Sequence, residues 1–411
     1  MEEEAAKRDR ISELPEEIKE KIVSSLCMKD AICTSSLSSV WRYTWVSLPF
    51  LDFGVDVYGR FTSYFKTLPT SHPKKRHLYS IFHKAEEEED DSESTVDNTD
   101  LYAWQIGYLQ MIDELLQIYI KKNPSLRVLK KMSLYVPILS NSKMIDYGAD
   151  IVSRCLSLAK HNVTELDCWI HYYGWPYCPE DSYRALQNCL PILESKTLTK
   201  LKLRGCYLAM VKKVDIPIDL PNLKHLRLTK FNVRENMLET LLAKCPALEK
   251  LEFSWWCEGF NVLRVPRLSK LKKLKVKYIY DVELIKINAM SLQCLTLLNL
   301  STKCKIKMAS NSCNNLVNLF LQGCAITDDF FNNVAEFPKL KTISLIDCPE
   351  LKHIKITSNS LTSFEVKDCP NLSWTELDTP KLLFIGNSSS RKSHDIDWLI
   401  AKQGIPLTSF Q

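Results

Sequence analysis

Apolar residues recur through most of the chain in one phrase, Leu-x-x-Leu-x-Leu, in which other apolar residues sometimes replace leucine. Strong copies begin at Leu198, Leu223, Leu248, Leu271, Leu292, Leu316, Leu340 and Leu361, a degenerate copy begins at Leu382, and weaker early copies begin at Leu129 and Val163. The last two apolar positions of each copy lie two residues apart, so they share one face of an extended strand. The pattern therefore predicts one short strand per copy.

The spacing between the copies identifies the kind of repeat. From Leu198 onward, successive copies begin 25, 25, 23, 21, 24, 24, 21 and 21 residues apart. Leucine-rich repeats have periods of about 20–29 residues, and each repeat buries its apolar side chains against the next. We therefore expect an α/β repeat fold, a leucine-rich-repeat solenoid (horseshoe), over residues 101–385, with a C-terminal cap at 386–411. Secondary apolar phrases at Leu351 and Leu372 predict further strands on the convex side of the late repeats.

The N-terminal part of the chain has a different periodicity. Apolar residues recur every four positions at Leu14, Ile18, Ile22 and Leu26, which predicts one short helix with an apolar stripe and Ser12 as its N-cap. The pattern up to residue 47 indicates three short helices. Such a small unit buries little surface by itself, so it either packs on a partner or is only marginally stable.

The residues of this N-terminal unit resemble the plant F-box motif in order and spacing. The matching positions are Ile11-Ser12-Glu13-Leu14-Pro15, Ile18, Ile22, Leu26, Lys29-Asp30-Ala31, Thr34-Ser35, Leu37-Ser38, Trp41-Arg42-Tyr43, Trp45, Ser47-Leu48-Pro49 and Leu51-Asp52-Phe53. One departure is Ser39-Val40, where the motif usually has a basic pair. Together with the repeats, the segment 10–53 makes the chain similar to plant F-box/leucine-rich-repeat proteins.

This resemblance implies a function. In that family the F-box docks on a Skp-family adaptor, which joins a cullin–RING core, and the repeats hold a target protein for an SCF-type E3 ubiquitin ligase. The residues expected to contact the adaptor are Ile11, Leu14, Pro15, Ile18, Ile22, Leu26, Leu37 and Trp41. The expected compartment is the cytoplasm, the nucleus or both, and no cofactor is expected. Two alternatives are an adaptor-bound interaction scaffold and a small-ligand sensor, both without degradative output.

Three further ranges complete the expected domain organisation. Residues 1–9 are expected to be a flexible N-terminus, and residues 54–82 a connector. Residues 83–100 combine a run of Glu and Asp with Ser, Thr and Asn, and contain few apolar residues. Like charge without apolar residues predicts a disordered acidic loop.

Positive charge is concentrated in four of the repeats, although the chain as a whole carries a net charge of only +5. Residues that flank the last two apolar positions should face the concave surface. In the copies beginning at 198, 223, 248 and 271, eight of these twelve residues are basic, whereas the next four copies have only Lys367. The candidate substrate-binding residues are Lys200, Lys202, Arg204, Arg227, Lys250, Lys273, Lys275 and Lys277, together with Trp255 and Trp256 in the following loop.

Three interpretations of this basic surface remain open: a solvated face, a site for an acidic or phosphorylated protein segment, and a site for a small anion such as an inositol phosphate. The hormone receptors of the plant F-box repeat family carry such a phosphate, but no specific residue match supports its transfer here. Nucleic acid is disfavoured because aromatic residues are not interleaved with the cations.

Motifs for catalysis or metal binding are absent from the sequence. It contains no P-loop, no dinucleotide fingerprint and no Gly-x-Ser-x-Gly or His-Glu-x-x-His. Cys168, His171 and Cys178 lack the second ligand pair of a zinc site. Cysteines at the end of the repeat phrase, Cys206, Cys324, Cys348 and Cys369, are expected to bond the backbone as reduced thiols. We therefore expect no enzyme activity, no metal, no signal peptide and no transmembrane helix.

Overall fold

The computed structural model describes residues 10–67, 99–123, 129–138, 142–172, 192–206, 217–255, 257, 259–301, 303–309, 314–331 and 338–388. The chain divides into two compact units, unit 1 at Met1–Leu198 and unit 2 at Thr199–Gln411. Each unit is described by itself below.

Unit 1 begins with the short helices of the F-box segment. These are α1 (Glu16–Ser24), α2 (Met28–Cys33) and two 3-10 turns, η1 (Thr34–Ser36) and η2 (Thr44–Ser47), followed by strand β1 (Phe50–Phe53). The predicted N-cap is wrong: Pro15 precedes α1, and Ser12 instead shares a hydrogen bond of 2.9 Å with the Ser38 hydroxyl. Proline suits the start of a helix because the first N–H groups have no partner inside the helix.

The rest of unit 1 builds the first repeat strands. It contains α3 (Val55–Thr67), α5 (Thr99–Lys122), β2 (Lys131–Ile138), α6 (Ser142–Asn162) and β3 (Glu165–Tyr172). Helix α5 begins early enough to include Thr99 and Asp100 of the expected acidic loop. Residues 83–98 of that loop lie outside the described residues. Helix α3 lies within the expected connector.

The F-box segment is continuous with the repeat sheet of unit 1. Strand β1 pairs in parallel with β2, and β2 pairs in parallel with β3. Buried side chains of α5 reinforce this junction: the Tyr108 hydroxyl donates to the Phe53 carbonyl at 2.7 Å, and the Tyr119 hydroxyl donates to the Leu48 carbonyl at 3.3 Å. Burial raises the pKa of Tyr119 to about 12, so its hydroxyl keeps the proton it donates. The F-box is therefore held by the first repeat.

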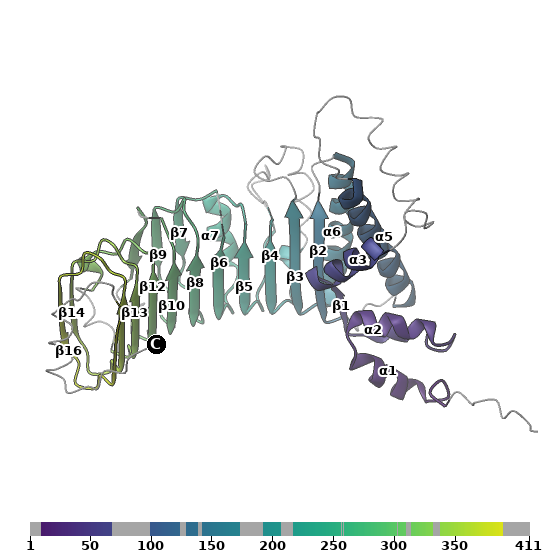
Figure 1. The fold of residues 1–411 in the computed structure, drawn as a ribbon, viewed down its shortest axis with the longest axis horizontal. Coiled ribbons are helices and arrows are strands. Elements are labelled where there is room, and N and C mark those ends of the chain that lie inside the picture. Colours follow the sequence, from purple (N-terminus) through teal and green to yellow (C-terminus); the bar gives the residue numbers. More distant parts are fainter. Residues whose placement is uncertain are drawn as a thin grey trace, which may run out of the picture. The chain divides into compact units, whose positions relative to one another are not determined.

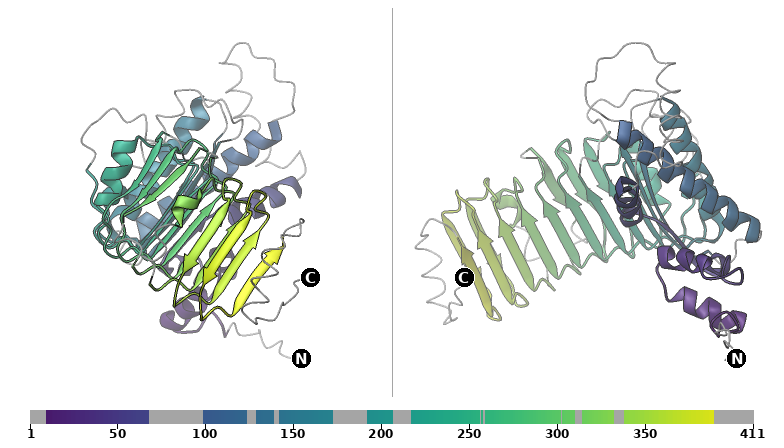
Figure 2. Two further views of the ribbon diagram at one scale, coloured as in Figure 1. Left: turned by 90° about the vertical axis from the view of Figure 1, so that its left-hand side faces the viewer. Right: turned by 45° about the vertical axis from the view of Figure 1, so that its right-hand side comes forward.

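Unit 2 contains a long parallel sheet with one strand from each strong copy of the repeat phrase (Figure 1). Its strands are β4 (Lys200–Arg204), β5 (His225–Thr229), β6 (Lys250–Ser254), β8 (Lys273–Lys277), β10 (Cys294–Leu298), β12 (Asn318–Gln322), β13 (Thr342–Ile346), β15 (Ser363–Lys367) and β17 (Phe384–Ser388). They stack in the order of the sequence (Figure 2). The predicted leucine-rich-repeat solenoid is confirmed. Strand β17, from the degenerate copy, enters the expected cap, whose residues 389–411 lie outside the described residues.

Shorter strands form the second layer of unit 2. One sheet contains β7 (Val262–Val265), β9 (Leu284–Ile287) and β11 (Lys305–Met308), and another contains β14 (His353–Thr357) and β16 (Trp374–Asp378). The strands expected near Leu351 and Leu372 are thus confirmed, whereas β7, β9 and β11 were not predicted. Helix α7 (Glu235–Ala243) packs on β7, and η5 (Asp328–Phe330) is a single turn. Apolar side chains of both sheet layers are buried; examples are Leu251 and Val276 in the long sheet and Ile285 in the second layer.

Most strands of the long sheet are followed by a residue in the left-handed backbone conformation, which we call the turn ladder. Its members, with φ between 47° and 70°, are Gly205, Lys230, Trp255, Tyr278, Asn299, Gly323, Asp347 and Asp368. The N–H groups of the first seven members continue the sheet; that of Trp255, for example, donates to the Lys277 carbonyl at 3.1 Å. Glycine suits position 323, since a Cβ there would lie 2.3 Å from Oδ1 of Asn299, whose side chain would have to move. The fold itself therefore favours Gly, Asn or Asp at these positions.

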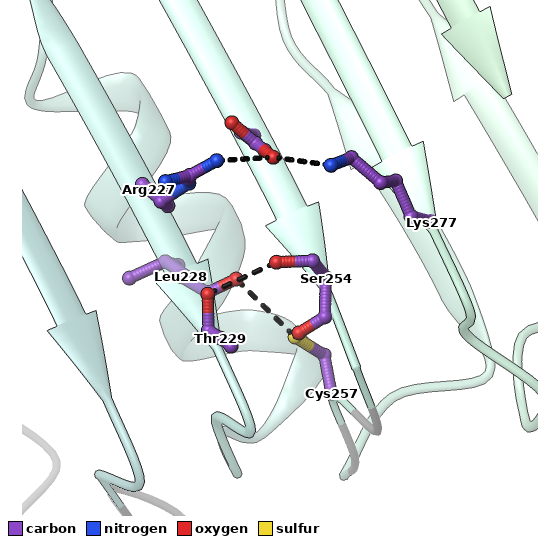
Figure 3. Close-up of polar contacts among 7 residues, drawn as sticks. Arg227, Leu228, Thr229, Ser254, Cys257 and Lys277 are labelled. Atoms are coloured by element: carbon purple, nitrogen blue, oxygen red, sulfur yellow. Dashed lines mark hydrogen bonds and ion pairs between the residues drawn. The ribbon is translucent and has the colours of Figure 1, made fainter. Parts of the chain in front are cut away.

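The four predicted cysteines bond the backbone: Cys206 Sγ donates to the Arg204 carbonyl of its own repeat at 3.8 Å, and the three later cysteines also bond the preceding repeat. Sγ of Cys324 donates to the Leu297 carbonyl at 3.6 Å, and Cys348 and Cys369 make equivalent contacts. Cys257 Sγ likewise donates to the Leu228 carbonyl at 3.7 Å (Figure 3). Cys257 lies three residues after the end of β6 and was not among the predicted cysteines. Burial raises the pKa of Cys324 to about 12, which keeps the thiol protonated and able to donate.

Candidate functional site

Exposed apolar side chains are concentrated in the F-box segment. Of the twelve large hydrophobic residues exposed in the described parts of the chain, six lie between residues 11 and 43. This F-box apolar group contains Ile11, Ile18, Ile22, Leu37, Val40 and Tyr43. Scattered exposed apolar residues are ordinary on protein surfaces, but such a concentration in one short segment indicates a surface that is covered by a partner.

Helix α1 turns its apolar stripe away from the interior of unit 1. Ile18 and Ile22 are 44% and 38% exposed, whereas Val23 is fully buried. Lys19 is also buried, with its ammonium 2.9 Å from the Glu16 carboxylate. A helix that packed only on its own protein would bury the isoleucines and expose the lysine. The orientation of α1 is thus the strongest structural sign of a binding surface in the F-box.

The other residues expected to contact an adaptor differ in their exposure. Pro15 is exposed, while Leu14 and Leu26 are half-buried. Trp41 is only 1% exposed, so it belongs to the interior of the F-box rather than to its surface. Val40 and Tyr43 were not predicted as contacts. The sequence did hold a sign that Val40 is unusual, because Ser39-Val40 stands where the F-box motif usually has a basic pair.

The basic residues of unit 2 lie on one face of the long sheet, which we call the open sheet face. The register aligns them in rows that run across the strands β4, β5, β6 and β8. The rows are Lys200–His225–Lys250–Lys273, Lys202–Arg227–Glu252–Lys275 and Arg204–Thr229–Ser254–Lys277. The leucines and valines between these positions are buried. The predicted grouping of the cations on one face is confirmed.

One carboxylate organises two of these cations. Glu252 Oε1 accepts a hydrogen bond of 2.8 Å from Arg227 Nη2 and lies 3.1 Å from Lys277 Nζ. Figure 3 shows Arg227 and Lys277 reaching toward each other from the two strands that flank β6. Burial opposes ionisation of Glu252, but the hydrogen bonds from Arg227 and Lys277 outweigh it and hold the pKa of Glu252 below its usual value. The sequence alone did not reveal this pairing.

The lysines next to Glu252 have a different environment. Lys250 and Lys273 are exposed neighbours in one row. Partial burial and the nearby charge of Lys277 lower the pKa of Lys275, with Glu252 acting in the opposite direction. Eight cations and one carboxylate on the open sheet face of four strands create a positive local potential that attracts anions.

An aromatic pair borders this basic face. Trp255 is 48% exposed, and its ring stacks on Tyr278 with ring centroids 4.3 Å apart and planes inclined by 23°. Of the two candidate tryptophans after β6, Trp255 is thus exposed, whereas Trp256 lies outside the described residues. Tyr278 was not predicted, although it follows β8 just as Trp255 follows β6.

Other candidate chemistry finds little support in the described part of the chain. No group of three or more His, Cys, Asp or Glu side chains there could hold a metal ion. Cys168 is buried, His171 shares a 2.7 Å hydrogen bond with the Tyr135 hydroxyl, and Cys178 lies outside the described residues. Within the same ranges, no helix is both long enough and apolar enough to cross a bilayer.

An F-box whose last strand joins a leucine-rich-repeat sheet, followed by further stacked repeats, defines the class of F-box/leucine-rich-repeat proteins. Comparison with known families agrees with this assignment. The F-box domain model matches residues 11–53, and the model described as "FBD-associated F-box protein At5g56370, LRR repeats" matches residues 152–311. The chain is thus similar to F-box/leucine-rich-repeat proteins in both its F-box and its repeats.

Curated relatives from Arabidopsis thaliana carry the same combination in their names. F-box/LRR-repeat protein At2g42720 is 28% identical over 316 residues, covering 75% of this chain and 56% of the relative. Putative F-box/LRR-repeat protein At5g41840 is 24% identical over 288 residues, covering 67% of this chain and 44% of the relative. F-box/FBD/LRR-repeat protein At5g22700 is 45% identical over 56 residues. The chain thus spans about half the length of the first two relatives.

Proposed function

We propose that this protein is the substrate-recognition subunit of an SCF-type E3 ubiquitin ligase. In this proposal the F-box apolar group binds a Skp1-type adaptor, and the repeats bind a target protein. The observation that carries the proposal is the outward apolar stripe of α1, Ile18 and Ile22, opposite the buried Val23. Exposed isoleucines cost free energy in water, and covering them by a partner recovers it.

The proposed mechanism is one of positioning. The chain holds a target near the ubiquitin-conjugating machinery, and the rate of transfer rises because the effective concentration of target lysines rises. The bond-forming chemistry belongs to other subunits. Tight attachment of the F-box to the first repeat, through β1 and the hydroxyl groups of Tyr108 and Tyr119, limits the motion between adaptor and unit 1. The proposed site of action is the cytoplasm, the nucleus or both.

Co-purification with ubiquitin transfer tests the proposal. The tagged full chain is expected to recover a Skp1-type adaptor together with a cullin. The double variant Ile18→Asp/Ile22→Asp should lose both, since two carboxylates would be buried in the interface without partners. Leu383→Asp is the matched control, because Leu383 is an exposed hydrophobic residue of unit 2 at 76% exposure.

Three outcomes separate the alternatives. Loss of adaptor and cullin in the F-box variant alone, with ubiquitylation of a bound protein by the wild type, supports the proposal. Adaptor binding without ubiquitin transfer to any bound protein favours an interaction scaffold instead. Equal adaptor recovery by the wild type and the F-box variant removes the basis of the proposal. Native mass measurement of the purified chain detects a retained small ligand, as a ligand sensor requires.

A further inference from the structure

Trp255 and Tyr278 occupy an unusual place for aromatic residues. They are consecutive members of the turn ladder, with φ of 58° and 53°. Other members of the ladder include Gly205, Gly323 and Asn299, residue types that tolerate this conformation. Bulky side chains in the left-handed region are rare, and such strain concentrates at functional sites. The turn needs no ring at these positions, so another role must account for the two aromatics.

Exposure and stacking point to that role. The Trp255 ring lies against Tyr278 at 4.3 Å and still leaves Trp255 48% exposed. Tyr280, two residues further along the chain, is 49% exposed. Stacking on Tyr278 restricts the indole to one orientation, so little side-chain entropy is lost when a partner binds it. Rigid, exposed tryptophan is a residue type enriched at the energetic centres of protein interfaces.

The aromatic pair adjoins the cations of the open sheet face. Ser254 and Lys277, which immediately precede Trp255 and Tyr278, are partners in the same row. Lys250 and Lys273 lie on the same two strands, four residues before Ser254 and Lys277. Glu252 is the one carboxylate in these rows. It is held by Arg227 and Lys277, and it adds a negative charge only at the centre of the open sheet face. A ligand that crosses this face therefore meets cations first and an aromatic surface at the edge.

We propose that the open sheet face of β5, β6 and β8, together with the Trp255–Tyr278 pair, docks an extended acidic segment of a partner protein that also carries an aromatic or apolar side chain. Carboxylates or phosphates of the segment lie over Lys250, Lys273 and Lys275, and the apolar side chain packs on Trp255. This inference deepens the proposed function, on which it rests, by giving the chemical class of the target. Neighbouring strands are about 4.8 Å apart, so an acidic run of about four residues spans the lysines.

A protein segment fits this surface better than single-stranded nucleic acid. Trp255 and Tyr278 stack on each other, so the faces between them are already occupied and cannot receive successive bases. Glu252 in the middle of the rows also repels a continuous phosphate backbone. An acidic peptide can place an uncharged residue over Glu252, which a nucleic-acid backbone cannot do.

Binding of defined probes to the purified full chain tests the inference. The probes are fluorescent synthetic peptides with an acidic run followed by tryptophan, the same peptides with alanine for tryptophan, uncharged versions with glutamine for glutamate, and a single-stranded oligonucleotide. The acidic peptide with tryptophan should bind most tightly, and its affinity should fall as salt is raised. Removing either the charges or the tryptophan should weaken binding about tenfold or more.

Substitution by glycine separates a functional ring from a structural one. Trp255→Gly removes the ring and relieves the left-handed strain, so the chain should remain at least as stable while affinity for the acidic peptide falls about tenfold or more. Asp347→Gly is the matched control, because it changes an equivalent turn-ladder position (φ 50°) away from the basic rows and should leave affinity unchanged. Lys273→Ser with Lys275→Ser should weaken the acidic peptide and reduce the salt dependence.

Several results would overturn the inference: unchanged affinity in Trp255→Gly, equal binding of the uncharged peptide, or tighter binding of the oligonucleotide. Adaptor recovery is measured on the same variants and should be unaffected. If the wild type binds no adaptor but distinguishes the peptides as expected, the proposed function fails and the docking surface stands. If adaptor binding holds and the peptides are not distinguished, only the docking surface fails.

Discussion

The double substitution Ile18→Ala/Ile22→Ala should separate binding from stability in the F-box. Burial of a complete isoleucine side chain contributes about 1.5–3 kcal/mol. Ile18 and Ile22 are 44% and 38% exposed, so covering what remains exposed is worth about 1 kcal/mol for each residue. Truncating both should therefore cost about 2 kcal/mol of adaptor binding, or about a thirtyfold rise in Kd. Alanine is the best helix former, so α1 itself should persist.

The assay is calorimetric or interferometric titration of the purified chain with a Skp1-type adaptor, next to denaturant unfolding of each variant. Val23→Ala on the opposite side of α1 is the control, since Val23 is fully buried and its truncation should cost about 2 kcal/mol of folding stability. The reasoning is refuted if the variant Ile18→Ala/Ile22→Ala loses about 2 kcal/mol of folding stability while its affinity for the adaptor is unchanged.

Three further predictions concern the repeats and the thiols. Lys230→Gly should raise the free energy of unfolding by about 1 kcal/mol, because Lys230 has φ 47°; denaturant titration checks this, and a less stable variant contradicts it. The pKa of Glu252 is lowered in the folded protein, so its ion pairs stabilise at neutral pH and are lost as pH falls below about 4.3 and through the folded value. Wild type should then lose stability more steeply with acid than Glu252→Gln does, and parallel acid curves would exclude this role. In native alkylation followed by mass spectrometry, the exposed Cys27 and Cys33 should react, while Cys324, buried and with its pKa raised to about 12, should stay protected; fast labelling of Cys324 would contradict the structure.

Much of the repeat architecture was predictable because its signal is local and repeated. Alternation of apolar and polar residues assigns each side chain of β5, β6 and β8 to a face, and nearly constant spacing aligns the copies. The placement of Lys250, Lys273 and Lys275 on one face follows from these two facts alone. The second layer was harder to predict, since short strands such as β7 and β9 contain too few residues to show a clear period.

Periodicity determined by itself that α1 has an apolar stripe, that the repeats form strands and that cations share one sheet face. Only the tertiary structure decided that Ile18 faces solvent and Trp41 the interior, because a stripe fits a partner's surface as well as the protein's own core. It also decided the pairing of Glu252 with Arg227, 25 residues away, and the stacking of Trp255 on Tyr278. Such contacts join residues from different repeats, so they depend on how the strands stack and on the backbone conformation at each turn, neither of which a local pattern encodes.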